Sequence, residues 1–158
     1  SLHMTLVFLG YHPEKRIERV AEAAIEVDDR APEIRLDPEP VGVPRGRRPR
    51  LFALDAPSEG AVELQSQVER RLVEARFYEP EKRPFWPHLT VARVRPERRG
   101  SRKPAPVETP PGPLPEQLFR PFSAVRLTLY RSHLRPQGAE YIPMAVKDLK
   151  PAESTTER

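Results

Sequence analysis

With 158 residues, the chain has room for one domain or a tight two-lobed unit, and 37% of its residues are apolar. The lack of cysteine excludes a disulfide framework, a thiol nucleophile and a thiolate metal site, and it fits a cytoplasmic location. Lys and Arg total 27 against 23 Asp and Glu, so the net charge of +4 attracts polyanions more weakly than dedicated nucleic-acid binders do. No apolar run approaches the roughly 20 residues of a membrane span. We expect a monomer without a membrane partner.

Strands and helices alternate in the first part of the chain. Residues 3–10 form an apolar run that is closed by Gly10, and they predict a strand. Apolar residues then recur at helical spacing from Pro13 to about Val27 and predict a helix. Residues 33–43 alternate only weakly and carry prolines, which is typical of an irregular edge strand.

A basic loop and a second helix follow. The loop covers residues 42–49 and, after Arg50, leads into a predicted strand at 51–54. Ser58 is a favoured N-cap residue, and the apolar stripe behind it predicts a helix to about Ala75. Residues 77–87 form a connector that is rich in proline and aromatic side chains.

The second half of the chain predicts strands and loops. Residues 88–95 form a strand, and the basic, proline-rich residues 96–115 form a loop outside the core. A short turn at 116–119, two strands at 122–130 and 141–146, and a frayed polar tail at 151–158 complete the chain. The order favours an α+β fold in which residues 1–150 form one domain, with helices on the outer faces of two small, mainly antiparallel sheets.

Two similar motifs, one in each half of the chain, carry the chemistry. His3 and Thr5 lie two apart on the first predicted strand, and His88 and Thr90 lie two apart on the later one. Because side chains alternate along a strand, each His shares a face with its Thr, and the apolar neighbours share the other face. Two such strands beside one cleft would bring two imidazoles and two hydroxyls together.

Two imidazoles suit metal-free chemistry at a phosphate. Imidazole has an unperturbed pKa near 6.5, so it accepts or donates protons near neutral pH. One ring takes a proton from the attacking water and the other protonates the leaving oxygen, each typically worth about 10²–10⁴ in rate. The Thr hydroxyls donate to non-bridging oxygens as their negative charge grows. This arrangement suits a 2′,3′-cyclic phosphate, whose alkoxide leaving group needs a proton, and it requires no metal and no cofactor.

The motifs also admit other interpretations. Half-exposed His and Thr are common in strands, although the repeat of the same pair favours a site. A two-His metal centre lacks a third ligand nearby in the sequence. A rival hypothesis from another class is a non-catalytic RNA-end-binding module, which would hold phosphorylated ends with its cleft and its arginine loop.

The segments His3–Gly10 and Pro87–Val94 closely resemble the two H-x-T-x signatures of the 2H phosphoesterase superfamily. Within it they are most similar to the LigT-like RNA 2′,3′-cyclic phosphodiesterases, historically called 2′-5′ RNA ligases. Val125–Ser132 resembles that family's penultimate strand, and the resemblance covers about residues 2–147. It implies a bilobal, pseudo-twofold α+β fold whose sheets line a cleft. We expect the strand and helix that family members carry ahead of the first motif to be missing from this chain.

The resemblance also implies an activity, which is hydrolysis of RNA 2′,3′-cyclic phosphates to 2′-phosphates. Some members join or cleave 2′-5′ linkages in tRNA halves, so the implied partners are RNA ends or 2′,3′-cyclic nucleotides. By motif position, His3 would be the proton donor and His88 the proton acceptor, and the reverse reaction exchanges these roles. Thr5 and Thr90 would hold the phosphate.

Four further residues are candidates for substrate binding: Arg93, Tyr130, Ser132 and Arg48. Strict alternation places Arg93 on the face opposite His88, so a phosphate role needs a twist or a bulge. Arg48 belongs to the basic loop, which would attract RNA phosphates regardless of base sequence. Trp86 offers a stacking surface for a base, but packing beside the second motif is the favoured interpretation.

Overall fold

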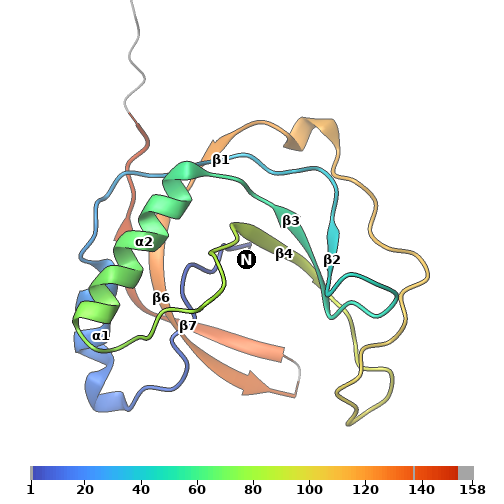
Figure 1. Ribbon diagram of the computed structural model, residues 1–158, viewed down its shortest axis with the longest axis horizontal. Helices are drawn as coiled ribbons and strands as arrows, with labels where there is room; N and C mark the ends of the chain where they lie inside the picture. Colours follow the sequence, from blue (N-terminus) through green and yellow to red (C-terminus); the bar gives the residue numbers. More distant parts are fainter. Residues whose placement is uncertain (1, 137, 153–158) are drawn as a thin grey trace, which may run out of the picture. The chain divides into compact units, whose positions relative to one another are not determined.

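The computed structural model describes residues 2–136 and 138–152, and Figure 1 shows the order of their helices and strands. The chain divides into two compact units, each assembled from separate stretches of sequence. The first unit contains residues 2–5, 34–58 and 86–122, and the second contains the rest of the described chain. The helices and antiparallel sheets confirm the predicted α+β class. Within the described chain, no helix is both long and apolar enough to cross a membrane.

The first unit is built on an antiparallel sheet in the order β2-β3-β4. Its strands are β2 (Val41–Val43), β3 (Leu51–Asp55) and β4 (His88–Arg93). β3 is the central strand, and its residues 52–54 are buried, as expected of an apolar run with a neighbour on each side. The strands predicted at 51–54 and 88–95 are confirmed as β3 and β4.

The weakly alternating segment 33–43 forms two short strands instead of one. β1 (Glu33–Ile34) and β2 are separated by a stretch with two prolines, which have no backbone N–H to donate to a ladder. β1 pairs with β5 (Phe122–Ser123) in a small two-stranded sheet. The predicted edge strand is therefore only partly correct.

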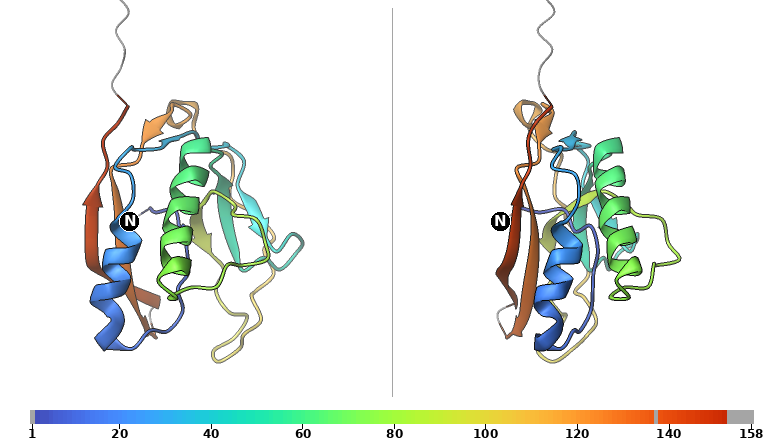
Figure 2. Two further views of the ribbon diagram at one scale, coloured as in Figure 1. Left: turned by 60° about the vertical axis from the view of Figure 1, so that its left-hand side comes forward. Right: turned by 90° about the vertical axis from the view of Figure 1, so that its left-hand side faces the viewer.

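The second unit combines two helices with a long antiparallel ribbon. A 3₁₀ turn, Glu14–Arg16, leads into α1 (Ile17–Ile25), and α2 spans Glu59–Glu74. The ribbon consists of β6 (Arg126–Arg135) and β7 (Gly138–Asp148). Figures 1 and 2 show α1 against this ribbon and beside α2. Both predicted helices are confirmed.

The helices form because their apolar residues recur every three or four positions and meet in one core. The buried cluster consists of Val20, Ala23, Ala24, Val68, Leu72 and Phe77. Leu72 of α2 has no exposed surface. Both α-helices lie in the second unit, so the α-helical content of the described chain reports on that unit.

The later strands differ from the prediction in length. The single strand predicted over 122–130 is divided between β5 and β6, and a 3₁₀ turn at Glu116–Leu118 precedes it where a turn is predicted. β6 and β7 extend beyond their predicted bounds because they pair with each other along nearly their whole length. Of the predicted polar tail, residues 153–158 lie outside the described residues.

The strand predicted over residues 3–10 is wrong. Residues 2–13 contain no strand, and the segment is divided after Thr5 between the two units. A strand is stabilised by backbone hydrogen bonds to a neighbour, which an alternating sequence by itself does not supply.

Side-chain alternation persists in the first part of this segment without a ladder. His3 and Thr5 are exposed, whereas Met4 and Leu6 are half-buried. The alternation ends at Val7, which is half-buried like Leu6, and Phe8, which the pattern places on the buried side, is 72% exposed. The pattern therefore gives the side-chain directions correctly only at the start of the segment.

Candidate active site

The ladder between β3 and β4 places the second motif on one face of the sheet. His88 lies opposite Asp55, and Thr90 lies opposite Ala53. Residues directly opposite in an antiparallel pair share a face, so the imidazole and the hydroxyl lie on the same side, as predicted. Leu89 lies on the other face and is buried. The second motif therefore has both its polar face and its apolar anchor.

A β-bulge in β4 brings Arg93 to the same face. The register with β3 shifts at Val91, which has no directly opposite partner and is 39% exposed. Arg93 lies opposite Leu51, which shares a face of β3 with Asp55 and hence with His88. Strict alternation predicts the opposite face for this arginine, and the extra residue of the bulge is the reason for the difference.

The His88 ring makes two contacts with a single residue, Trp86. Its Nδ1 lies 2.7 Å from the carbonyl oxygen of Trp86, and its plane stacks on the Trp86 indole with centroids 4.0 Å apart and an interplanar angle of 16°. A carbonyl oxygen only accepts, so this bond requires a hydrogen on Nδ1. In the neutral ring Nε2 then has a free lone pair and can accept a proton.

Trp86 is in turn held by Asp55, because the indole Nε1–H donates to the Asp55 carboxylate. The predicted packing of Trp86 beside the motif is confirmed. Asp55 adjoins the second motif, and the sequence motifs do not reveal it. Its only signal is a carboxylate at the end of a predicted strand, and its position opposite His88 depends on the pairing of β3 with β4.

His3 and Thr5 belong to the same compact unit as His88 and Thr90. Both side chains are exposed, and neither residue lies on a strand. The convergence of the two motifs on one phosphate stays a prediction.

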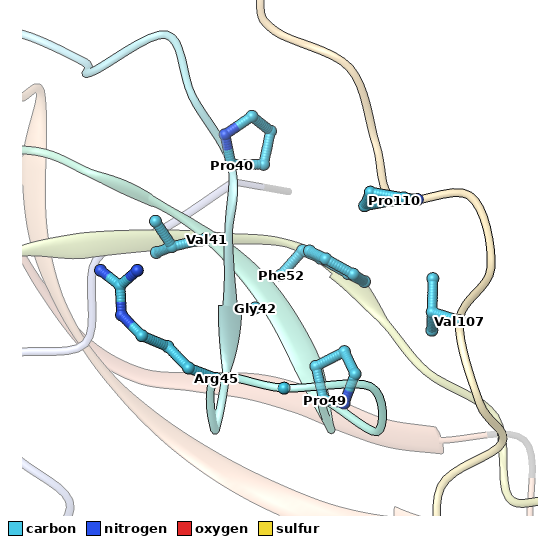
Figure 3. Close-up of a pocket in the computed structure, with 9 residues that line it drawn as sticks. Pro40, Val41, Gly42, Arg45, Pro49, Phe52, Val107 and Pro110 are labelled. Atoms are coloured by element: carbon cyan, nitrogen blue, oxygen red, sulfur yellow. The ribbon is translucent and has the colours of Figure 1, made fainter.

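Two hollows adjoin β2 in the first unit. One of about 400 Å³ is lined by Val41, Gly42, Val43, Arg45, Asp55 and Trp86. The other, of about 310 Å³, is lined by Phe52, by proline and valine side chains and by Arg45, and Figure 3 shows the Arg45 guanidinium on its Val41 side. Both volumes lie at the lower end of the range for small-ligand sites, and the first adjoins the residues that hold His88.

Arg48 makes contacts within the protein. Its guanidinium donates to the Pro104 carbonyl at 2.9 Å and to the Glu97 carboxylate at 3.1 Å. These bonds tie the basic loop to the proline-rich loop, as does the bond from the Val107 N–H to the Arg47 carbonyl. A substrate role for Arg48 stays a prediction, and its contacts favour a role in holding the loops.

Tyr130 and Ser132 lie on β6 in the second unit, and both are exposed. The Tyr130 ring meets the Tyr141 ring edge to face at 5.9 Å. Their roles in substrate binding stay predictions. Among the described residues, no group of three or more His, Cys, Asp or Glu side chains is placed to hold a metal ion.

Comparison with known proteins adds to this geometry. The family model of the 2′-5′ RNA ligase superfamily matches residues 1–136. TT0787 of Thermus thermophilus is similar in structure, with a TM-score of 0.73 and 26% identity over 96% of this chain and 79% of that chain. E. coli LigT complexed with 3′-AMP has a TM-score of 0.68 and 21% identity over 94% of this chain and 76% of that chain, which shows a shared fold. A search of curated proteins gave no match.

Proposed function

Because this chain belongs to the 2′-5′ RNA ligase superfamily, we propose that it is a metal-independent phosphodiesterase that hydrolyses RNA 2′,3′-cyclic phosphates to 2′-phosphates. The observation that carries the proposal is the β4 face, on which His88, Thr90 and Arg93 lie together. A proton acceptor, a neutral hydroxyl and a fixed positive charge on one surface match the needs of a phosphate under attack by water.

In the proposed reaction, His88 accepts a proton at Nε2 from the attacking water. The water oxygen forms a bond to phosphorus while the bond from phosphorus to O3′ breaks. His3 donates a proton to O3′, so that the product carries a 2′-phosphate and a free 3′-hydroxyl. The hydrogen bond from Nδ1 to the Trp86 carbonyl supports the acceptor role, because it leaves Nε2 available.

The hydroxyls and the arginine would stabilise the charge on the non-bridging oxygens. Thr5 and Thr90 donate hydrogen bonds to these oxygens, and Arg93 adds a fixed charge that persists throughout the reaction. The bulge at Val91 supports this assignment because it turns Arg93 towards the His88 face. His3 and Thr5 complete the site in this proposal, and they share a compact unit with the β4 residues.

The proposed substrates are RNA ends and 2′,3′-cyclic nucleotides. E. coli LigT has been described in complexes with 3′-AMP, NADP⁺, ATP and phosphate, and each of these ligands is or contains a phosphate group. The hollow of about 400 Å³ beside Trp86 offers space for part of a nucleoside next to the reacting phosphate. Joining of 2′-5′ linkages would use the same groups in reverse, with the acid and base roles exchanged.

The direct test is turnover of a 2′,3′-cyclic nucleotide in the presence of EDTA, with the product identified as a 2′-phosphate or a 3′-phosphate. We expect turnover with a bell-shaped pH profile and a 2′-phosphate product. His3→Ala and His88→Ala should each lose at least about 10²-fold in kcat, whereas His133→Ala, on β6 of the other unit, should retain activity.

Two outcomes would contradict the proposal. Full activity in both His3→Ala and His88→Ala would exclude the paired-imidazole mechanism. Tight binding of RNA ends without turnover under any condition would favour the rival, a binding module of the same fold.

A further inference from the structure

The side chains of Asp55 and Trp86 lie next to His88 at one end of the β3–β4 ladder, and their role is distinct from that of His88. We propose that Trp86, anchored by Asp55, is a positioning residue that holds the His88 imidazole in one orientation and one tautomer. The effect on turnover rests on the proposed function. The effect on the ring itself is independent of it.

Trp86 restrains the imidazole in two directions. Its backbone carbonyl bonds Nδ1 at 2.7 Å in the plane of the ring, and its indole stacks against the face of the ring with centroids 4.0 Å apart. The hydrogen bond selects the tautomer with a hydrogen on Nδ1. The stack resists rotation about the Cβ–Cγ bond, a torsion that is otherwise broad for histidine.

The backbone between these two residues is also stiff. Pro87 fixes its own φ and disfavours the helical region for Trp86, so the segment is held extended. In an extended chain, residues two apart share a side, which brings the indole and the imidazole together. The Ala56 N–H donates to the Pro87 carbonyl at 3.0 Å and continues the contact between the two strands.

Asp55 restrains the indole of Trp86 directly, and it therefore acts on His88 only through Trp86. Its carboxylate accepts the Nε1–H of Trp86, and this is the donor that an indole offers. In a Ser-His-Asp site the carboxylate bonds the imidazole Nδ1 directly. In this cluster a backbone carbonyl occupies Nδ1, so the carboxylate acts one step away.

Four variants separate the contributions of this cluster. Trp86→Ala removes the stack and keeps the backbone carbonyl, so we expect kcat to fall about 10–100-fold, the loss that small misplacements of a reacting group produce. KM does not separate the roles of Trp86, because its side chain also lines the hollow proposed for the nucleoside. Trp86→Phe retains a stacking ring but not the N–H, and should lose less. Asp55→Ala frees the indole and should resemble Trp86→Phe. Asp55→Asn still offers an acceptor oxygen and should recover most of the activity that Asp55→Ala loses.

A double-mutant cycle tests whether Asp55 acts through the indole N–H. Adding Asp55→Ala to Trp86→Phe should cost less than about twofold more, because the bond that Asp55 makes is already absent. Additive losses would overturn the assigned route. Tyr11→Ala removes an aromatic ring that is 90% exposed in the other unit, and serves as the matched control.

Nuclear magnetic resonance observes the His88 ring directly. Long-range ¹H–¹⁵N spectra of imidazole-labelled protein report which nitrogen of His88 carries the hydrogen, with assignment from the spectrum of His88→Gln. We expect a single Nδ1–H tautomer when the ring is neutral. We expect a mixture in Trp86→Ala, because a ring that rotates without the stack no longer keeps Nδ1 against the carbonyl oxygen of residue 86. An unchanged tautomer and unchanged kcat in Trp86→Ala, with the protein folded by circular dichroism, would overturn the proposal. A changed tautomer in a protein without turnover would instead show that the positioning role is correct and the proposed reaction is not.

Discussion

Arg93→Ala is the substitution that most directly tests how the β-bulge shapes the site. The bulge at Val91 places this guanidinium on the face of His88. Among the arginines of the nearby loops, Arg48 is engaged with Glu97 and Pro104. Removing Arg93 should therefore remove a fixed positive charge from the proposed phosphate position.

The size of the effect follows from the kind of bond that is lost. A hydrogen bond from a charged group contributes about 1.5–3 kcal/mol, which corresponds to about 10–150-fold in kcat/KM. Arg93 is exposed, so solvent screens its charge and the loss should lie near the lower end, about 10–30-fold. Arg93→Lys keeps the charge but not the planar fork, and should lose less.

The assay is the initial rate of 2′,3′-cyclic nucleotide hydrolysis at low and high salt. Arg70→Ala removes an exposed arginine from α2 and is the matched control, for which we expect less than a twofold change. The loss in Arg93→Ala should shrink as salt rises, because the missing contribution is electrostatic.

A second variant tests the bulge itself. Arg93→Ala combined with Ala92→Arg moves the guanidinium to position 92, which lies opposite Phe52 on the other face of the sheet. We expect no recovery of activity. Recovery would refute the register argument, because only strict alternation places position 92 on the His88 face. A loss in Arg93→Ala no larger than in Arg70→Ala would refute the phosphate role.

Three further predictions address the hydroxyl, the core and the surface charges. Thr90→Val should lower kcat about 10–10³-fold in the same assay, by analogy with the loss of one oxyanion donor, whereas Thr90→Ser should retain most of it. Leu72→Ala should lower the free energy of unfolding by about 2–5 kcal/mol in urea titrations followed by far-ultraviolet circular dichroism, since Leu72 is fully buried between the helices; a loss under about 1 kcal/mol would contradict this. The hydrogen bond and charge of Lys150 lower the pKa of Asp29, and Asp29 raises the pKa of Lys150. The contribution of this exposed pair is therefore present between the unfolded values of 3.8 and 10.5, and lost as the pH falls through the lowered pKa of Asp29 or rises through the raised pKa of Lys150. Lys150→Met should lower the melting temperature slightly at pH 7 and not at pH 2 or in 1 M salt, and equal effects at both pH values would contradict it.

The helices and the central strands were predictable because each follows from the spacing of apolar residues within one segment. The apolar stripes behind Pro13 and Ser58 predicted α1 and α2, and the apolar run at 51–54 predicted β3. The first predicted strand failed for a different reason. Residues 3–10 have the composition and alternation of a strand, but a strand also needs a hydrogen-bonded neighbour, and none is paired with this segment in the described chain.

The residues of the candidate site also divide into those that the local sequence reveals and those that it does not. His88 and Thr90 were identified from their spacing, since residues two apart on a strand share a face whatever the strand pairs with. Asp55 was not, because nothing local indicates that the end of β3 lies opposite the start of β4.

By itself, the sequence determined the α+β class, the two helices, and the polar face of the second motif, because each follows from the order of side chains along a short stretch of backbone. Only the tertiary structure decided which face Arg93 occupies and what holds the His88 ring. The bulge at Val91 and the contact of Asp55 with Trp86 depend on the register between strands that are more than 30 residues apart in the chain. Register is a property of two paired strands, and no single segment of the chain contains it.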